Sequence, residues 1–160
     1  MKKIKKGIRL KEIKEAYRIA RKVGLETRGS VMLGHPFETK KTALETLRFI
    51  TDLRDCQQAY INIATPYPGT ELYDMALKGE GGIRLLTQDF KEYRRYGDAV
   101  IEVNDLHKQD LIKLQRKGFL MFYLKPKRII YNLKRAGIVA GIINAMAFLK
   151  SVFGSLALTK

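Results

Sequence analysis

The sequence is poor in the residues that build covalent or metallic links. It has 160 residues but a single cysteine, Cys56, and two histidines, His35 and His107. One thiol cannot form an internal disulfide, and it cannot supply the three or four thiolates of an iron–sulfur or structural zinc site. The chain therefore supplies neither kind of link by itself. Cys56 is expected to be an inert thiol.

Long apolar runs are also lacking. The basic N-terminus is not followed by the apolar segment of a signal peptide, and we interpret the chain as cytoplasmic. Residues 137–149 form an uncharged stretch of thirteen residues, short of the roughly 20 that span a bilayer. An interfacial or packed amphipathic helix is expected there. With 46% apolar and 29% charged residues, the composition is typical of a globular domain and excludes general disorder.

Acidic residues are scarce, and the formal net charge is +15. The basic excess lies at the two ends: residues 1–22 hold ten Lys or Arg against two Glu, and residues 107–135 hold nine against one Asp. Residues 23–106 hold ten against thirteen. Basic ends favour an anionic membrane surface or a nucleic acid. Because no RNP, zinc-finger or helix-turn-helix pattern is present, peripheral membrane contact through the C-terminal tail is the favoured alternative.

The periodicity of apolar residues predicts an α/β fold. Helices are expected at residues 9–22, about 40–53 and 70–77, and strands at 25–33 and 59–64. Short loops between them indicate parallel strands with right-handed crossovers. The second helix is expected to be capped by Thr39 or Thr42, with Thr42 and Glu45 as a possible capping box.

The second half of the chain is expected to be less regular at first and then helical. Residues 79–105 read as a surface excursion, since Gly79, Gly81 and Gly82 mark a loop. A helix is expected at residues 106–123, capped by Asn104 or Asp105, and another from about residue 127 after a break at a proline.

Functional loops of parallel sheets follow the carboxyl ends of the strands, here residues 34–39 and 65–70. Gly34 lets backbone amides approach a ligand at a helix N-terminus, and His35 could act as a general acid or base. Metal ligation by His35 is disfavoured. The prolines and glycine of the second loop form a rigid turn that could present backbone groups to an adenine. The alternatives are that Glu38 only favours the helix dipole and that both loops only turn the chain.

The same loops carry a resemblance to a known family. Gly34-His35-Pro36-Phe37-Glu38-Thr39 after one strand and Pro66-Tyr67-Pro68-Gly69-Thr70-Glu71-Leu72 after the next resemble the C-terminal half of a radical S-adenosylmethionine enzyme. The subgroup with a cobalamin-binding domain is the most similar, and the resemblance covers about residues 5–130. It implies a partial (β/α) barrel made of its last two to three βα units with parallel strands, followed by an α-helical tail. The implied regions are 1–80 for the barrel portion, 81–105 for an irregular connection and 106–160 for the basic helical tail.

The resemblance also implies a binding site. It implies no catalytic residue and no metal ligand in this chain. Substrate contacts are expected at His35 and Tyr67, and contacts to S-adenosylmethionine are expected at Gly34, Pro36, Glu38, Thr39, Asn62, Pro66, Pro68 and Gly69. A [4Fe–4S] cluster and cobalamin are implied for the complete parent, with ligands outside this chain.

The cluster loop of the family, CxxxCxxC, has no counterpart here. The chain is therefore expected to be a fragment that is inactive alone and that needs the N-terminal half of the barrel, from the same or a separate chain, to act on a small-molecule substrate. An isolated half barrel should aggregate, dimerise or partly unfold. The alternative function is a non-catalytic basic module that binds an anionic membrane surface or RNA.

Overall fold

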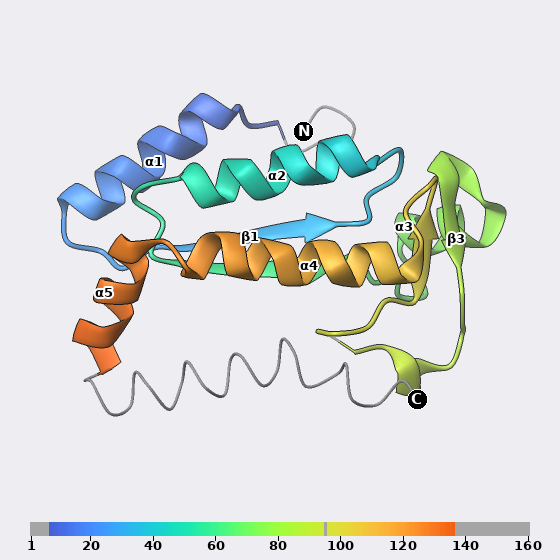
Figure 1. Ribbon diagram of the computed structural model, residues 1–160. Coiled ribbons are helices and arrows are strands. Elements are labelled where there is room, and N and C mark those ends of the chain that lie inside the picture. The colour runs from blue at the N-terminus through green and yellow to red at the C-terminus, as the bar shows by residue number, and fades with distance from the viewer. Residues whose placement is uncertain (1–6, 95, 137–160) are drawn as a thin grey trace.

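A pair of parallel strands with helices packed on one side forms the centre of the molecule (Figure 1). The structure is a computed structural model that describes residues 7–94 and 96–136. Strands β1 (Arg28–Leu33) and β2 (Gln58–Ile63) are connected by helix α2 (Lys40–Asp52). They pair in parallel over their full length, from Arg28 opposite Gln58 to Leu33 opposite Ile63. The expected mixed α/β fold with parallel strands is confirmed.

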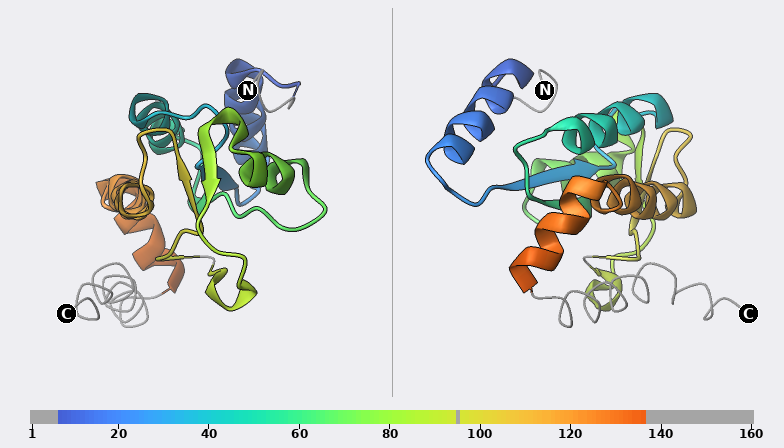
Figure 2. Two further views of the ribbon diagram at one scale, coloured as in Figure 1. Left: turned by 90° about the vertical axis from the view of Figure 1, so that its right-hand side faces the viewer. Right: turned by 60° about the vertical axis from the view of Figure 1, so that its left-hand side comes forward.

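Helices α2 and α4 (Lys108–Tyr123) cover one face of this strand pair (Figure 2). Successive strand residues point to opposite faces, so every second residue of β1 and β2 packs against these helices. The helix layer approaches closely at Gly118 of α4, where an added Cβ would lie 2.5 Å from Leu47 and 2.7 Å from Ile61. The core between the layers is dominated by Leu33, Ala43, Leu47, Ile61, Ile63, Leu111 and Leu114.

The opposite face of the strand pair has a different character. It carries the remaining alternate residues of the two strands, and we call it the open face: Arg28, Ser30, Met32, Gln58, Tyr60 and Asn62. Met32 is 40% exposed and Tyr60 is 37% exposed. The described helices therefore leave much of this surface uncovered, whereas a closed α/β layer would bury it.

The outer edge of β2 is closed by side chains of α4. The Tyr123 hydroxyl accepts a hydrogen bond from the Ala59 amide at 3.2 Å and donates to the Ala59 carbonyl at 3.1 Å. The Gln115 amide nitrogen donates to the Ile61 carbonyl at 2.8 Å. An edge strand exposes backbone groups that can pair with another chain, and here α4 occupies them.

The remaining helices lie around this unit. Helix α1 (Leu10–Lys22) packs at the edge of β1, where the Tyr17 hydroxyl donates to the Arg28 carbonyl at 2.8 Å. Helix α3 (Glu71–Lys78) follows β2, and α5 (Pro126–Ala136) begins at the expected proline break. None of the helices within residues 7–94 and 96–136 has the length and apolarity needed to cross a membrane.

The segment expected to be a surface excursion contributes to the core instead. It contains two short helical turns, η1 (Glu80–Gly82) and η2 (Phe90–Glu92), and the antiparallel strands β3 (Ile83–Leu85) and β4 (Ile101–Val103). Ile83, Ile101 and Val103 are fully buried. Strands of three residues are too short to show an alternating pattern, so only their packing against the rest of the chain reveals them.

One expected helix cap is confirmed with a different capping-box partner, and another is wrong. Helix α2 is capped by Thr39, whose hydroxyl accepts from the Thr42 amide at 3.3 Å, and the partner in the capping box is Thr42 and not Glu45. Helix α4 begins at Lys108 after His107, whose amide donates to the Asp110 carboxylate at 3.2 Å. Neither Asn104 nor Asp105 caps it. The interfacial helix expected at 137–149 lies outside the described residues.

Candidate functional site

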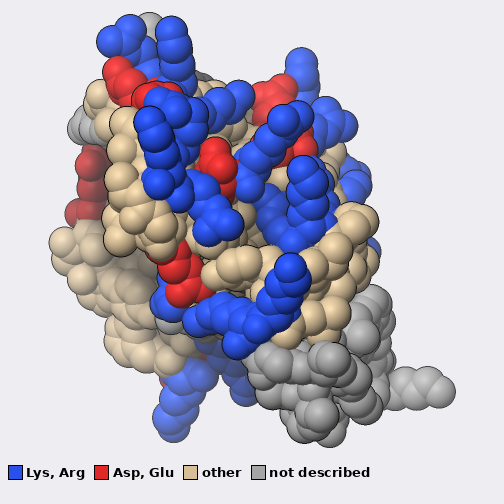
Figure 3. All heavy atoms as spheres, turned by 90° about the vertical axis from the view of Figure 1, so that its left-hand side faces the viewer, with Lys and Arg blue, Asp and Glu red and all other residues tan. Residues whose placement is uncertain are grey.

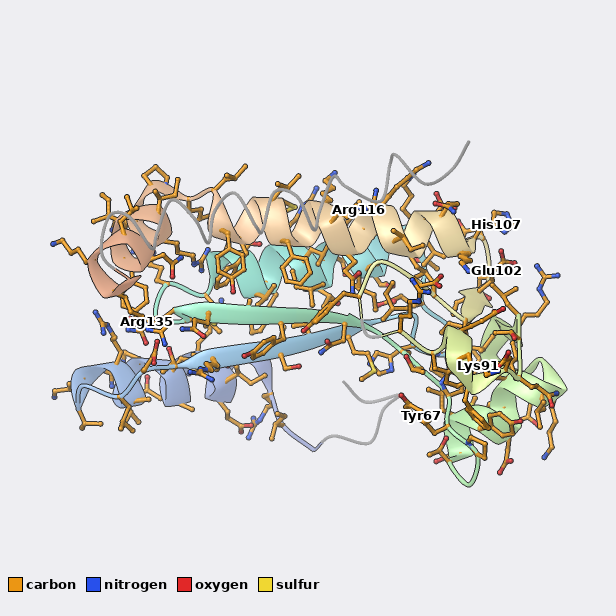
Figure 4. All side chains as sticks on the ribbon, turned by 90° about the horizontal axis from the view of Figure 1, so that it is seen from below. Tyr67, Lys91, Glu102, His107, Arg116 and Arg135 are labelled. Atoms are coloured by element: carbon orange, nitrogen blue, oxygen red, sulfur yellow. The ribbon has the colours of Figure 1, made fainter. Side chains whose placement is uncertain are left out.

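The two candidate loops leave the strand pair side by side. Leu33 and Ile63 end the register of β1 and β2, and the Ala64 amide donates to the Leu33 carbonyl at 2.7 Å. A Cβ added to Gly34 would lie 3.7 Å from the Ala64 Cβ. We call residues 34–39 and 65–70 together the strand-end rim. In Figure 4, Tyr67 lies beyond this end of the strands and Arg135 lies at the other end.

Glu38 is folded back into its own loop. It is 7% exposed, and its carboxylate accepts a hydrogen bond from the Gly34 amide at 2.5 Å. Burial raises the pKa of the Glu38 carboxyl, while hydrogen bonds from the Gly34 and His35 amides oppose that rise. A carboxylate held by two amides of its own loop fixes the shape of the loop, so Glu38 orients the backbone around Gly34.

The first loop is also fastened from the segment 79–105. The Phe37 amide donates to the Gly81 carbonyl at 2.7 Å, and the Asn104 side-chain amide donates to the Glu38 carbonyl at 2.7 Å. The Asn104 backbone amide in turn donates to the Gly82 carbonyl at 2.8 Å. We call Gly81, Gly82 and Asn104 the loop latch. The backbone of Phe37 takes a φ of 63°, a left-handed conformation that such contacts must hold in place.

One weak sign of the loop latch is visible in the sequence, whereas its contact with Glu38 is not. The glycines at 81 and 82 marked a loop, but nothing local connects Asn104 to Glu38, which lies 66 positions earlier. A Cβ on Gly82 would fall within 1.9 Å of the Asn104 side-chain oxygen, so glycine is required there by the close approach. This requirement is visible only in three dimensions.

The other predicted residues of the first loop have mixed exposure. His35 and Pro36 are half-buried, and Phe37 is exposed. The His35 carbonyl accepts from the Glu38 amide at 3.0 Å, which closes the loop before Thr39 caps α2. The His35 imidazole is thus carried on a loop whose backbone is fixed on both sides.

The second loop is a tight turn that caps α3. Pro66 is buried, whereas Tyr67, Pro68 and Gly69 are exposed. The Thr70 amide and hydroxyl donate to the Tyr67 carbonyl at 3.1 Å and 2.7 Å, and the Thr70 hydroxyl accepts from the Tyr73 amide at 3.2 Å. The backbone of this loop is therefore largely pre-arranged.

Tyr67 belongs to an aromatic group that the sequence did not predict. Its ring centroid lies 5.6 Å from that of Tyr93, which lies 5.2 Å from the ring of Phe90. Tyr93 and Phe90 come from the segment 79–105. The ring planes are inclined by 57° and 67°, so the three rings pack against one another in tilted and edge-to-face contacts.

Asn62 lies on the open face just before the second loop. Its side-chain nitrogen donates to the Ser30 hydroxyl at 3.2 Å, and its side-chain oxygen is buried without a hydrogen-bond partner among the described residues. Buried polar atoms in folded proteins are normally paired. This acceptor is therefore suited to a donor from a ligand or from further chain.

The rim can bind and orient, but this chain offers little for holding a metal ion. Among the residues that the structure describes, no three His, Cys, Asp or Glu side chains gather in a group that could ligate one. Cys56 is buried at the opposite end of the strands, its thiol donates to the Gln58 carbonyl at 3.0 Å, and burial raises its pKa. One buried thiol does not fit an iron–sulfur cluster. A separate pocket of about 520 Å³ between α3 and β3 is lined by none of the predicted site residues.

Two known proteins are similar to this chain, while no protein-family model matches it. The chain is 35% identical over 130 residues to a protein of Pyrococcus horikoshii named as an uncharacterised methyltransferase, and this match covers 81% of the chain and 27% of that protein. It is 33% identical over 98 residues to a protein of Methanocaldococcus jannaschii named as a methylthiotransferase, covering 61% of the chain and 22% of that protein. The chain thus spans about a quarter of the length of these relatives.

Proposed function

We propose that this chain is the C-terminal part of a radical S-adenosylmethionine enzyme and that its strand-end rim contacts the nucleoside of the cofactor and the substrate. The observation that carries the proposal is the adjacency of the two loops beside an open face with an unpaired buried acceptor on Asn62. Relatives named as a methyltransferase and a methylthiotransferase support a role in group transfer. Two strand-end loops at one edge are the usual place for a ligand in parallel α/β folds.

Five rim residues and Asn62 have distinct parts in this proposal. The backbone near Gly34 and Gly69 would bind the purine and ribose, since both glycines allow a ligand to approach the main chain. Glu38 would hold the first loop in shape, and Asn62 would offer its free oxygen to an amino or hydroxyl group. His35 and Tyr67 would face the substrate, with the His35 imidazole able to hold or move a proton. When bound, S-adenosylmethionine supplies a sulfonium whose carbon–sulfur bonds can be cleaved for group transfer.

The iron–sulfur cluster of such an enzyme does not fit the residues of this chain, because Cys56 is single and buried. We therefore assign no step to it here. Its ligands, and a cobalamin-binding domain, would lie elsewhere in the parent protein. Relatives about four times as long as the matched region leave room for both.

The partner that completes the barrel would join at the outer edge of β1. The Ala64 amide donates to the Leu33 carbonyl, across the gap between the two strands. Backbone groups of alternate residues point to opposite edges of a strand, so those of the odd-numbered residues of β1 point toward β2. Those of the even-numbered residues point to the outer edge. Among the described residues, no strand pairs with this outer edge of β1, where the Tyr17 hydroxyl donates to the Arg28 carbonyl, whereas α4 occupies the edge of β2. Further strands would therefore add beside β1, and residues 1–80 would form the last units of a partial barrel, with 81–105 as its connection and 106–160 as its tail.

The barrel proposal predicts the behaviour of the isolated chain. An unpaired edge at Ser30 and Met32 next to an uncovered face should make it dimerise, aggregate or unfold in part. Light scattering coupled to size-exclusion chromatography and thermal melting measure this. A monodisperse monomer with one cooperative transition would contradict the half-barrel architecture.

Ligand binding by the rim can be tested on the chain itself. We expect 5′-deoxyadenosine to shift the amide resonances of Gly34, Asn62 and Gly69 and to leave that of Arg128 unchanged. Asn62→Ala should weaken binding about tenfold, since one buried hydrogen bond is lost. Asn132→Ala on α5 is the matched control and should bind like the wild type. Shifts that are absent, or spread evenly over the chain, would refute the rim as a nucleoside site.

Activity requires the complete polypeptide. Its coding sequence should contain an in-frame CxxxCxxC motif before residue 1, and the anaerobically reconstituted protein should form 5′-deoxyadenosine or S-adenosylhomocysteine. Asn62→Ala should reduce that yield more than Asn132→Ala does. A complete protein without the motif and without either product would disprove the enzyme assignment.

A further inference from the structure

The end of the molecule opposite the rim exposes an unusual set of aliphatic side chains. Three lie at the end of α1 and in the loop after it, and three lie around the junction of α4 with α5. Their exposed fractions range from 41% to 66%: Ile19, Val23, Leu25, Leu124, Ile129 and Ile130. A single exposed aliphatic residue needs no explanation, but a group of them at one end of a molecule marks an interaction site.

Contacts between α5 and the loop after α1 join these residues into one surface. Glu26 follows Leu25 directly, and its carboxylate accepts from the Tyr131 hydroxyl at 2.9 Å and pairs with the Arg135 guanidinium at 3.1 Å. Both partners belong to α5. Figure 1 shows α5 and the C-terminal end of α1 at the same end of the molecule. We call this end, including the outer side of α5, the basal surface.

Cationic side chains surround the exposed aliphatic ones. On α5, Lys127, Ile130 and Lys134 are three and four positions apart and therefore lie along one side of the helix. Arg21 and Lys22 flank the apolar residues at the end of α1. Figure 3 views the molecule from this end, and Lys and Arg side chains gather over it with fewer acidic ones between them.

Two acidic residues at this end, Glu26 and Asp52, are paired with cations. Glu26 is held by Tyr131 and Arg135, and the Asp52 carboxylate pairs with the Lys125 ammonium at 2.9 Å. Lys125 holds the pKa of Asp52 below its usual value. The surface therefore presents a net positive field to a partner.

Helix α5 is fixed in place. The Arg128 side chain is buried and donates hydrogen bonds at 3.0 to 3.4 Å to carbonyls of three segments, while its guanidinium carbon lies 3.5 Å from the centroid of the Phe122 ring. The carbonyls belong to Thr51, Leu53, Cys56 and Phe122. A helix anchored in this way presents its outer residues without rearrangement.

We propose that the basal surface docks onto an anionic lipid membrane. Aliphatic side chains can enter the boundary of the acyl chains, while the lysines and arginines around them interact with anionic head groups. Single-stranded nucleic acid is recognised through aromatic stacking, and protein interfaces are depleted in lysine, so both fit this surface less well. In the sequence, α5 is followed by the uncharged stretch 137–149. The rim would then face away from the lipid.

Vesicle flotation of the full chain tests the proposal. The chain should float with vesicles of phosphatidylcholine and phosphatidylglycerol, should not float with phosphatidylcholine alone, and should be released by salt. Lys127→Gln and Lys134→Gln should each weaken partitioning about fivefold, the loss for one basic residue near an anionic surface. The pair Lys40→Gln and Lys41→Gln, exposed at the start of α2 at the rim end, is the control and should behave like the wild type.

The aliphatic residues give an independent test. Ile129→Ser with Ile130→Ser keeps every charge and should still weaken partitioning about tenfold, because apolar burial in the lipid is lost. Both residues are exposed, and an unchanged melting curve would show that folding is unaffected. Flotation of all these variants at wild-type levels would overturn the proposal, as would equal binding to neutral vesicles. Salt-sensitive binding to single-stranded RNA that depends on the lysines but not on the isoleucines, without flotation, would also overturn it.

Discussion

The two ends of the parallel strand pair are built in different ways. At the carboxyl ends, the loop 34–39 is shaped by hydrogen bonds from Glu38 and from the loop latch, and the loop 65–70 by Thr70. At the amino ends, Arg128 ties the ends of α2 and α4 to the start of α5, and lysines and arginines cover the outside. The difference separates two tasks. The pre-arranged backbone of the rim suits a small ligand. The rigid, positively charged opposite end stabilises the fold and presents the basal surface.

The largest effect should come from replacing Arg128, which holds the amino ends of the strands and the start of α5 together. Arg128→Met removes the Arg128 donor from four carbonyls, of which those of Thr51 and Leu53 keep a second donor, and it should lower the free energy of unfolding by about 3 kcal/mol. Arg128→Lys keeps the charge but loses the forked geometry, so about half of that loss is expected. Arg54→Met, at an exposed position of the same end, should change stability little. Urea denaturation measures all three, and equal midpoints for Arg128→Met and Arg54→Met would refute the role of Arg128.

The next effect should come from the latch. Gly82→Ala places a Cβ against the Asn104 side chain and should cost about 2 to 3 kcal/mol of unfolding free energy. Gly97→Ala is the matched control, because Gly97 has a similar φ of 74° but no heavy atom within 4 Å of an added Cβ. It should show only the backbone strain of about 1 kcal/mol. Equal losses in the two variants would mean that the contact with Asn104 is unimportant.

Asn104→Gly should increase the local opening of the loop 34–39 without affecting the opposite end of the strands. The substitution removes the hydrogen bond to the Glu38 carbonyl while a glycine accepts the φ of 51° without strain. A loss of about 1 kcal/mol is expected, seen as roughly fivefold faster hydrogen exchange at the Phe37 amide. The Ala59 amide, near the base, should exchange as before. Faster exchange at both amides would show that the two ends are not independent.

The smallest effect should be a pH dependence from Glu38. Because burial raises its pKa, the folded chain keeps the proton to a higher pH than the unfolded chain does. The stability contributed by this group is therefore present below the unfolded pKa of about 4.3 and is lost as the pH rises through the folded pKa. Glu38→Gln should flatten that fall, and Glu45→Gln, exposed on α2, should not. Urea titrations between about pH 4 and pH 7 measure the slope.

Local patterns were sufficient for the long elements of the first half. The expected helix at 9–22 and the observed α1 differ by one residue at the start, and α2, β2 and α3 also lie within one or two residues of expectation. Strand β1 begins at Arg28 instead of residue 25, because pairing with Gln58 sets its start. Elements of this length carry enough apolar residues at regular spacing to be recognised.

The site was only partly accessible to the same patterns. The two loops could be chosen because they follow strands, and the structure brings them to one edge of the pair. The loop latch and the aromatic group around Tyr93 could not be predicted, because they come from the segment 79–105 and make contacts over long sequence separations. The role of Glu38 also needed the structure, because its carboxylate could equally have faced a ligand.

The sequence by itself determined the order of the long helices and strands, the basic ends of the chain and the lack of thiols for a cluster, since each depends on residue type and spacing along the chain. Only the tertiary structure decided which face of the strand pair stays open, which edge is closed by α4 and what holds the loop 34–39. These features arise from contacts between residues up to 66 positions apart, where close packing and the pairing of buried polar groups select one arrangement among many that the local pattern allows.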